Sequence, residues 1–161
     1  MELRELDEMP RDAAIAWFLS ICHSRTWAES MADARPFGDT EKLQDTADKV
    51  WLGLGPDDWL EALEGHPRIG ESGGASQEHS QKEQAGMRDA SDSVAEAIAD
   101  GNRRYEERFG HIFLIAAAGR RPEEILGELT RRLHNDPDEE VRVAAEEHRR
   151  ITHLRLERML G

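Results

Sequence analysis

Apolar residues recur at intervals of three and four through most of the chain, the spacing that places them on one face of an α-helix. In the first half, this pattern predicts helices over residues 10–21, 24–34, 39–54 and 56–63. In the second half, it predicts helices over residues 77–99, 103–109, 122–133 and 136–160. The sequence therefore predicts an all-α fold, a compact single-domain bundle of about seven to eight helices over residues 1–161.

Three stretches depart from this pattern. Residues 65–76 hold four glycines and are expected to form a surface loop. Asp100-Gly101-Asn102 is expected to interrupt the helical pattern before residue 103. Residues 111–115 form a short apolar run between Gly110 and Gly119, and the run fits either an extended segment or a buried helical turn, because periodicity cannot separate the two.

The charge balance narrows the classes of function. The 161 residues include 34 acidic and 21 basic side chains, giving a net charge of −13 with histidine neutral. A surface this acidic repels phosphate groups, so we expect neither a nucleic-acid ligand nor an anionic membrane surface as partner. The four tryptophans lie at helical spacing among other apolar residues, and we expect each of them in the core.

Cysteine usage and the first residues bear on the compartment. The single cysteine, Cys22, excludes an internal disulfide framework and a cysteine-based zinc site. Residues 1–5 are too charged for a signal peptide, and no apolar run approaches the roughly 20 residues needed to span a bilayer. We therefore expect a cytoplasmic protein.

The last predicted helix carries an arginine where an apolar residue belongs. Its apolar stripe consists of Val141, Ala144, Ala145, His148, Ile151, Thr152, Arg155 and Met159. Arg155 lies near the centre of that stripe. Its side chain either reaches back to solvent, pairs with a structural carboxylate, or lines a cavity that receives an anion such as a carboxylate.

Polar residues also begin the stripe of the helix predicted over 77–99. Ser80, Glu83 and Gln84 fall on the same side as the apolar residues that follow them. A carboxylate there lies either at the mouth of a pocket or where the stripe runs out into solvent. Upstream, His66 precedes Pro67, which restricts the backbone of the histidine to an extended conformation.

Together these residues offer an acid–base pair, His66 and Glu83, and a cation for an anion, Arg155. No His-Glu-x-x-His pattern occurs, and no two histidines stand three or four residues apart, so we expect no metal site. Cys22 has no partner nearby in the sequence that would make it a nucleophile. Proton transfer on a small anionic substrate therefore fits the set better than acyl or phosphoryl transfer.

A series of sequence blocks in order along the chain resembles the 2-oxo-4-hydroxy-4-carboxy-5-ureidoimidazoline (OHCU) decarboxylase family. The blocks are residues 22–27 (CHSRTW), 35–37 (RPF), 58–63 (DWLEAL), 66–70 (HPRIG), 80–86 (SQKEQAG), 102–105 (NRRY), 108–115 (RFGHIFLI) and 151–156 (ITHLRL). The resemblance covers nearly the whole chain, and all blocks in the right order are far more specific than any one of them.

The resemblance implies an all-helical homodimer that decarboxylates OHCU to (S)-allantoin in urate degradation, without a cofactor. It implies that His66 and Glu83 are the catalytic pair, with the two proton transfers not assigned between them. The residues that the resemblance implies bind the substrate are Pro67, Ser80, Gln84, Phe113, Leu114, Ile115 and Arg155.

Two other functions compete with this interpretation. A non-enzymatic acidic helical interaction module would leave Glu83 and Arg155 exposed or paired only structurally. A hydrolase of a related ureido compound would normally require a metal or a nucleophile, and the sequence offers a clear candidate for neither.

Overall fold

The computed structural model describes residues 1–70 and 91–160. The described helices are α1 (Leu3–Glu8), α2 (Arg11–Ile21), α3 (Arg25–Asp33), α4 (Thr40–Leu52), α5 (Pro56–Leu63), α7 (Asp92–Phe109), α8 (Pro122–Arg132) and α9 (Pro137–Leu160). No residue within the described ranges belongs to a β-strand, which confirms the predicted all-α fold. The N-terminal part of the helix predicted over 77–99 lies outside the described residues.

The chain divides into two compact units. The first unit comprises residues 1–62 and 149–160, and the second comprises residues 63–148. Helix α9 contributes residues 137–148 to the second unit and residues 149–160 to the first.

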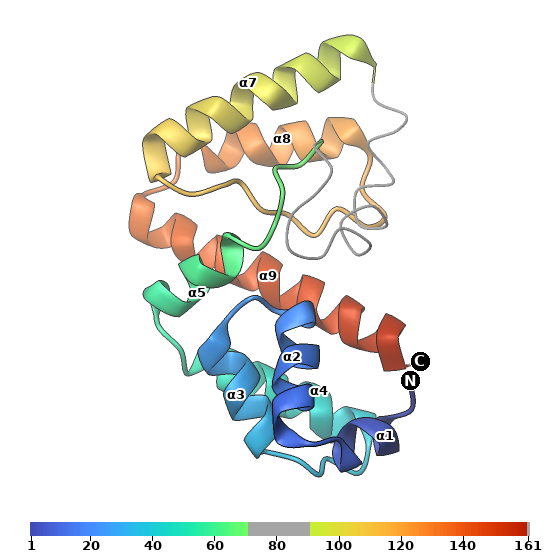
Figure 1. Ribbon diagram of the computed structural model, residues 1–161. Helices are drawn as coiled ribbons and strands as arrows, with labels where there is room; N and C mark the ends of the chain where they lie inside the picture. The colour runs from blue at the N-terminus through green and yellow to red at the C-terminus, as the bar shows by residue number, and fades with distance from the viewer. Residues whose placement is uncertain (71–90, 161) are drawn as a thin grey trace. The chain divides into compact units, whose positions relative to one another are not determined.

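In the first unit, α2 packs against α3 and α3 against α4 (Figure 1). The ring of Phe18 makes edge-to-face contacts with Trp17, Trp27 and Phe37, at centroid distances of 5.2, 5.6 and 6.3 Å. Trp27 and Trp51 are buried, as predicted, whereas Trp17 and Trp59 are only half-buried.

The short helix α1 is absent from the sequence-based prediction, because six residues give too little periodicity to recognise. Long-range hydrogen bonds hold it in place. Arg35 Nη1 donates to the carbonyl oxygens of Leu6 and Met9, at 2.9 and 2.5 Å. The carboxylate of Asp7 accepts from the backbone N–H of Phe37, at 2.9 Å. The residues between α3 and α4 thereby fix α1 through side-chain contacts.

Side-chain caps set several helix starts where the sequence predicts them. The hydroxyl of Ser24 accepts from the backbone N–H of Trp27 at the start of α3. The carboxylate of Asp39 accepts from the N–H of Lys42 at 2.7 Å, which begins α4. Pro122 occupies the first turn of α8, a position where a missing N–H costs no hydrogen bond.

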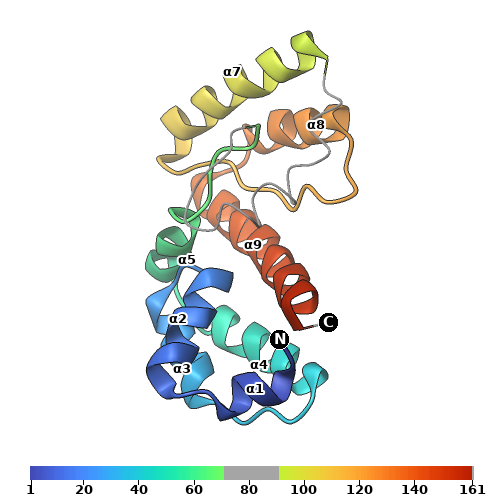
Figure 2. The same cartoon turned by 45° about the vertical axis from the view of Figure 1, so that its right-hand side comes forward.

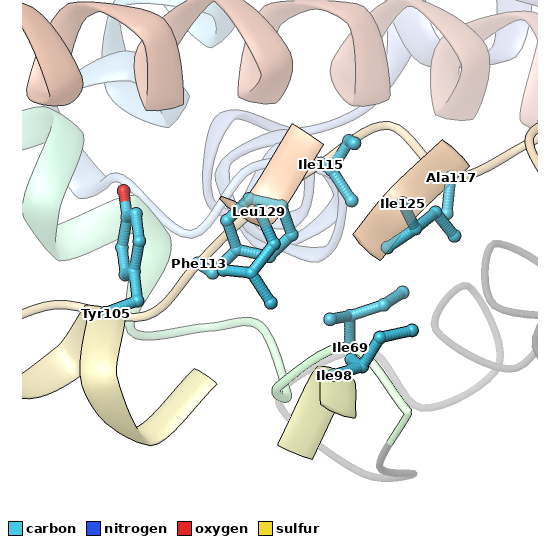
Figure 3. Packing of buried hydrophobic residues seen from close by; sticks show 8 residues of the cluster. All are labelled: Ile69, Ile98, Tyr105, Phe113, Ile115, Ala117, Ile125 and Leu129. Atoms are coloured by element: carbon cyan, nitrogen blue, oxygen red, sulfur yellow. The ribbon is translucent and has the colours of Figure 1, made fainter. Parts of the chain in front are cut away.

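In the second unit, α7 and α8 run side by side, and the segment that joins them passes along the pair (Figure 2). Apolar side chains from these three elements and from Ile69 point toward one another (Figure 3). The buried members of this cluster are Ile69, Ile98, Tyr105, Phe113, Ile115, Ala117, Ile125 and Leu129.

The predicted interruption at Asp100-Gly101-Asn102 is wrong, because α7 continues through these residues to Phe109. Gly101 faces α8 rather than ending a helix. A β-carbon at this position would lie 2.5 Å from Leu129 Cδ2 and 3.0 Å from its Cγ. The glycine therefore lets two helices approach closely. Its lower helix propensity costs about 1 kcal/mol relative to alanine.

We expect Gly101→Val to lower the free energy of unfolding by about 1–3 kcal/mol, because the added methyl groups overlap the Leu129 side chain. Gly127→Val is the matched control, since Gly127 is also helical, is exposed, and has no atom within 4 Å of the place that a β-carbon would occupy. Urea denaturation measures both. Equal stabilities of the two variants would contradict the close approach of α7 and α8.

Candidate active site

His66 lies three residues beyond the end of α5, in the second unit. Its backbone N–H donates to the carbonyl of Leu63 at 3.1 Å, which continues the last turn of the helix. The side chain is buried, with 9% of its surface exposed, and Pro67 beside it is half-buried. The imidazole therefore lies in a largely desolvated position. Water can offer it few hydrogen bonds there, so a protein group or a substrate has to provide them.

The ring of His66 meets a second histidine, which is missing from the site predicted from the sequence. The imidazole of His148 on α9 lies edge-to-face against it, with ring centroids 5.0 Å apart and an interplanar angle of 86°. His148 is completely buried. The sequence feature that could have identified His148 is its position in the apolar stripe of the last helix, and the same feature singles out Arg155.

The residues after His66 are packed against α7. Arg68 Nη2 pairs with Glu106 Oε1 at 2.8 Å, and Asn102 Nδ2 donates to the carbonyl of Ile69 at 3.2 Å. Gly65, His66 and Ile69 are buried. The surface loop predicted from residue 65 is therefore wrong for these positions, because Ile69 joins the core of the second unit and pulls the backbone inward.

A cavity of about 690 Å³ lies beside this segment and α7. Its lining includes Arg68, Ile69, Gly70, Ala95, Ile98 and Asn102. Neither His66 nor the segment 113–115 contributes to it. We therefore do not equate this cavity with the predicted substrate site.

Residues 113–115 form neither a helix nor a strand, so the helical-turn alternative for this run is wrong. Phe113, Leu114 and Ile115 are all buried, with 2–5% of their surface exposed. Phe113 and Ile115 join the hydrophobic cluster, whereas Leu114 does not, an alternation typical of extended backbone. The side chains on one side of the segment are therefore committed to the core.

Arg155 belongs to the first unit and is buried, with 3% of its surface exposed. Its Nη1 donates to the carbonyl of Ile21 at 2.8 Å. This burial confirms that the arginine faces the interior and excludes the alternative in which it reaches solvent. Because His66 belongs to the other unit, a pocket shared by the two side chains stays a prediction.

Ser80, Glu83 and Gln84 lie outside the described residues, so their predicted roles also stay predictions. Within the described ranges, no group of three or more histidine, cysteine, aspartate or glutamate side chains is placed to hold a metal ion. None of the described helices has the length and apolar character required to cross a membrane.

Cys22 follows α2 and is completely buried beside Arg155 and Ser24. Burial raises the pKa of its thiol to about 12, and the hydrogen bond with the Ser24 backbone and the nearby charge of Arg155 only partly offset this effect. At neutral pH the thiolate, which is the nucleophilic form, is therefore scarce. The chemistry of this position does not suit a covalent mechanism.

The described part of the chain is thus all-helical, with a buried imidazole at His66 in one unit and a buried guanidinium at Arg155 in the other. The chain belongs to the OHCU decarboxylase family, whose family model matches residues 7–157.

Curated relatives support this membership. The chain is 34% identical over 147 residues to the uric acid degradation bifunctional protein TTL of Arabidopsis thaliana, covering 87% of this chain and 45% of the relative. It is 28% identical over 159 residues to the 2-oxo-4-hydroxy-4-carboxy-5-ureidoimidazoline decarboxylase of Haloferax volcanii, covering 97% of this chain and 94% of the relative. The chain therefore spans less than half of the bifunctional plant protein and nearly all of the archaeal one.

Solved structures share the fold. An OHCU decarboxylase crystallised in the presence of (S)-allantoin superposes with a TM-score of 0.81 at 31% identity, covering 91% of this chain and 97% of that chain. An (S)-allantoin synthase superposes with a TM-score of 0.73 at 20% identity, covering 97% of this chain and 53% of that chain, and shows the shared fold alone.

We expect native Cys22 to resist alkylation by iodoacetamide at pH 8, where a pKa of about 12 leaves only about 10⁻⁴ of the thiol ionised. The protein unfolded in urea should be alkylated at least roughly 100-fold faster, since its thiol then has an ordinary pKa. Mass spectrometry of timed samples measures both rates. Rapid labelling of the native protein would show that the thiol is accessible and reactive.

Proposed function

We propose that the chain catalyses the decarboxylation of OHCU to (S)-allantoin, a carbon–carbon lyase reaction of urate degradation and purine catabolism. The observation that carries the proposal is the family match over residues 7–157. The likeness to a decarboxylase crystallised with (S)-allantoin, which covers 97% of that chain, supports the same substrate and product.

The chemistry of this substrate explains why an acid–base pair is sufficient. The reacting carbon carries a hydroxyl and a carboxylate and adjoins a ring C=N bond. When the bond to the carboxylate breaks, carbon dioxide leaves and the conjugated C=N accepts the electron pair. The hydroxyl-bearing carbon becomes a carbonyl when its hydroxyl gives up a proton, and the former C=N nitrogen takes up a proton. Another proton must be delivered to one face of the former C=N carbon, which carries the ureido group. The substrate therefore supplies its own electron sink, and we propose that the reaction needs no cofactor.

His66 is proposed to control the proton of the substrate hydroxyl. An imidazole titrates near neutral pH, so it can accept or return that proton under physiological conditions. The ring contact with His148 and the hydrogen bond from the His66 backbone N–H to Leu63 limit the positions of the His66 imidazole. Glu83 is proposed to assist or to supply the proton that the product carbon receives.

Arg155 is proposed to bind the anionic substrate through its guanidinium. The ring and ureido group of the substrate are proposed to be held by Ser80, Gln84, Pro67 and the backbone of residues 113–115. A protein with a net charge of −13 requires a local cation to attract such a substrate. A guanidinium in a buried position offers that cation in a planar geometry suited to a carboxylate. Rigid binding of one ring face explains how a single enantiomer would form.

We also propose that the protein is a cytoplasmic homodimer that acts as one OHCU decarboxylase domain. The family match across both compact units supports a single functional domain. The resemblance supports the dimer, which sedimentation velocity at micromolar concentration would test.

Circular dichroism tests the activity directly. OHCU is generated from urate by urate oxidase and hydroxyisourate hydrolase, and the signal of allantoin is followed with and without this protein. We expect faster appearance of one enantiomer. Racemic allantoin at the background rate would reject the proposal and favour the non-enzymatic interaction module.

We expect His66→Asn to lower the decarboxylation rate by roughly 10²-fold or more, the usual loss when a general acid or base is removed. Asn is polar and smaller than the imidazole, so the fold should persist. His134→Asn is the control, because His134 is an exposed histidine beyond α8. A near-normal rate for His66→Asn, measured by the same dichroism assay, would remove His66 from the mechanism.

We expect Arg155→Lys to raise the KM for OHCU, because an ammonium lacks the planar fork of a guanidinium. Because lysine keeps the charge, the loss of substrate affinity should stay below the about 2–5 kcal/mol expected when a charge-assisted pair in a desolvated site is lost altogether. Arg142→Lys on the exposed face of α9 is the control, and thermal unfolding checks that both variants are folded. An unchanged KM in folded Arg155→Lys would assign the arginine a purely structural role.

A further inference from the structure

An ion pair is completely buried in the second unit, away from His66 and Arg155 in the sequence. Arg132 at the end of α8 and Glu140 on α9 expose 1% and 0% of their side chains. Arg132 Nε donates to Glu140 Oε1 at 2.7 Å, and Nη2 lies 2.5 Å from the same oxygen. Burying two charges is expensive unless further hydrogen bonds satisfy them, so the partners of this pair are informative.

The carboxylate of Glu140 has two further partners. Its Oε1 accepts from the hydroxyl of Tyr105 on α7 at 2.5 Å, and its Oε2 accepts from Asn135 Nδ2 at 2.9 Å. Burial and the bond to Glu140 raise the pKa of Tyr105 far above its usual range, which keeps the hydroxyl a donor. Glu140 is therefore fixed from several sides, and it fixes Arg132 in turn.

The remaining side of the Arg132 guanidinium contacts the segment that joins α7 and α8. Arg132 Nη1 donates to the carbonyl of Leu114 at 2.8 Å, and the guanidinium carbon lies 4.5 Å from the ring centroid of Phe113. The pair thus contacts the backbone and a side chain of residues 113–115 at once. This segment has no helical or strand ladder of its own, so side chains have to hold it.

A second buried carboxylate of α9 holds the next residue. Glu147 Oε1 accepts from the N–H of Ala116 at 3.4 Å and pairs with Arg120 Nη2 at 3.3 Å. Arg120 Nε donates to the carbonyl of Ala116 at 3.1 Å. Glu140 and Glu147 are seven residues apart, about two turns along one face of the helix. The two carboxylates therefore fix the backbone of residues 114–116 through two arginines.

We propose that Arg132, oriented by Glu140, is a positioning residue for substrate binding. It sets the position of the Leu114 carbonyl, and with it the neighbouring backbone groups of residues 113–115. This inference rests on the proposed function, in which those backbone groups bind the ring and ureido group of OHCU. A purely structural ion pair would instead affect stability and leave substrate affinity unchanged in the folded protein.

Arg132→Lys tests the proposal, because one ammonium cannot reproduce the planar set of contacts to Glu140 and Leu114. We expect the KM for OHCU to rise about tenfold or more, since small misplacements of binding groups carry large costs. The amide signal of Ile115, which follows the Leu114 carbonyl, should shift in ¹H–¹⁵N spectra. Arg131→Lys is the matched control, since the neighbouring Arg131 is exposed and pairs with Glu128 on α8.

Glu140→Gln is the second variant, and it is used if Arg132→Lys does not fold. Glutamine keeps the shape of the side chain and an oxygen acceptor, but it no longer holds the guanidinium by charge. We expect the same rise in KM and the same shift at Ile115. Folded variants with wild-type KM and an unshifted Ile115 amide would overturn the positioning role.

The outcomes separate this inference from the proposed function. If the wild-type protein decarboxylates OHCU and the folded variant has an unchanged KM, the inference alone is rejected. A wild-type protein without activity would reject the proposed function, and the inference with it.

Discussion

Helix α9 has to bury charged side chains along the face that packs into the protein, and much of the structure follows from this constraint. Glu140, Glu147 and Arg155 are all buried on this helix. Each unpartnered charge would cost several kcal/mol, so neighbouring elements must supply partners at fixed places. The carbonyl of Ile21 fulfils this need in the first unit, and Arg132, Tyr105 and Asn135 fulfil it in the second.

The helices and their starts are predictable because they depend on local chemistry. Ser24 and Asp39 cap helices through bonds to residues three positions away, and such bonds are visible in the sequence. The continuity of α7 is not predictable in the same way. Gly101 has the same local signature whether it ends a helix or lets another helix approach, and only the position of Leu129, far along the chain, decides between them.

The candidate site is predictable in proportion to how unusual each residue is for its position. Arg155 stands out on an apolar stripe, and the structure buries it as expected. Arg132 and Glu140 give no such signal, because each looks like an ordinary charged residue near a helix end. Their burial depends on long-range pairing, which periodicity does not report. For His66, the family resemblance supplies what a single histidine in the sequence cannot.

The alternation along residues 113–115 has an evolutionary consequence. Phe113 and Ile115 place their side chains in the core, so recognition by this segment, under the proposed function, falls to peptide groups that every amino acid possesses. Its side chains are then selected for volume and apolar character rather than for identity. The side chains of this segment can be exchanged for other large apolar residues while the peptide groups keep their proposed contacts with the ligand. Substrate specificity and core packing can therefore evolve separately within one short stretch of chain.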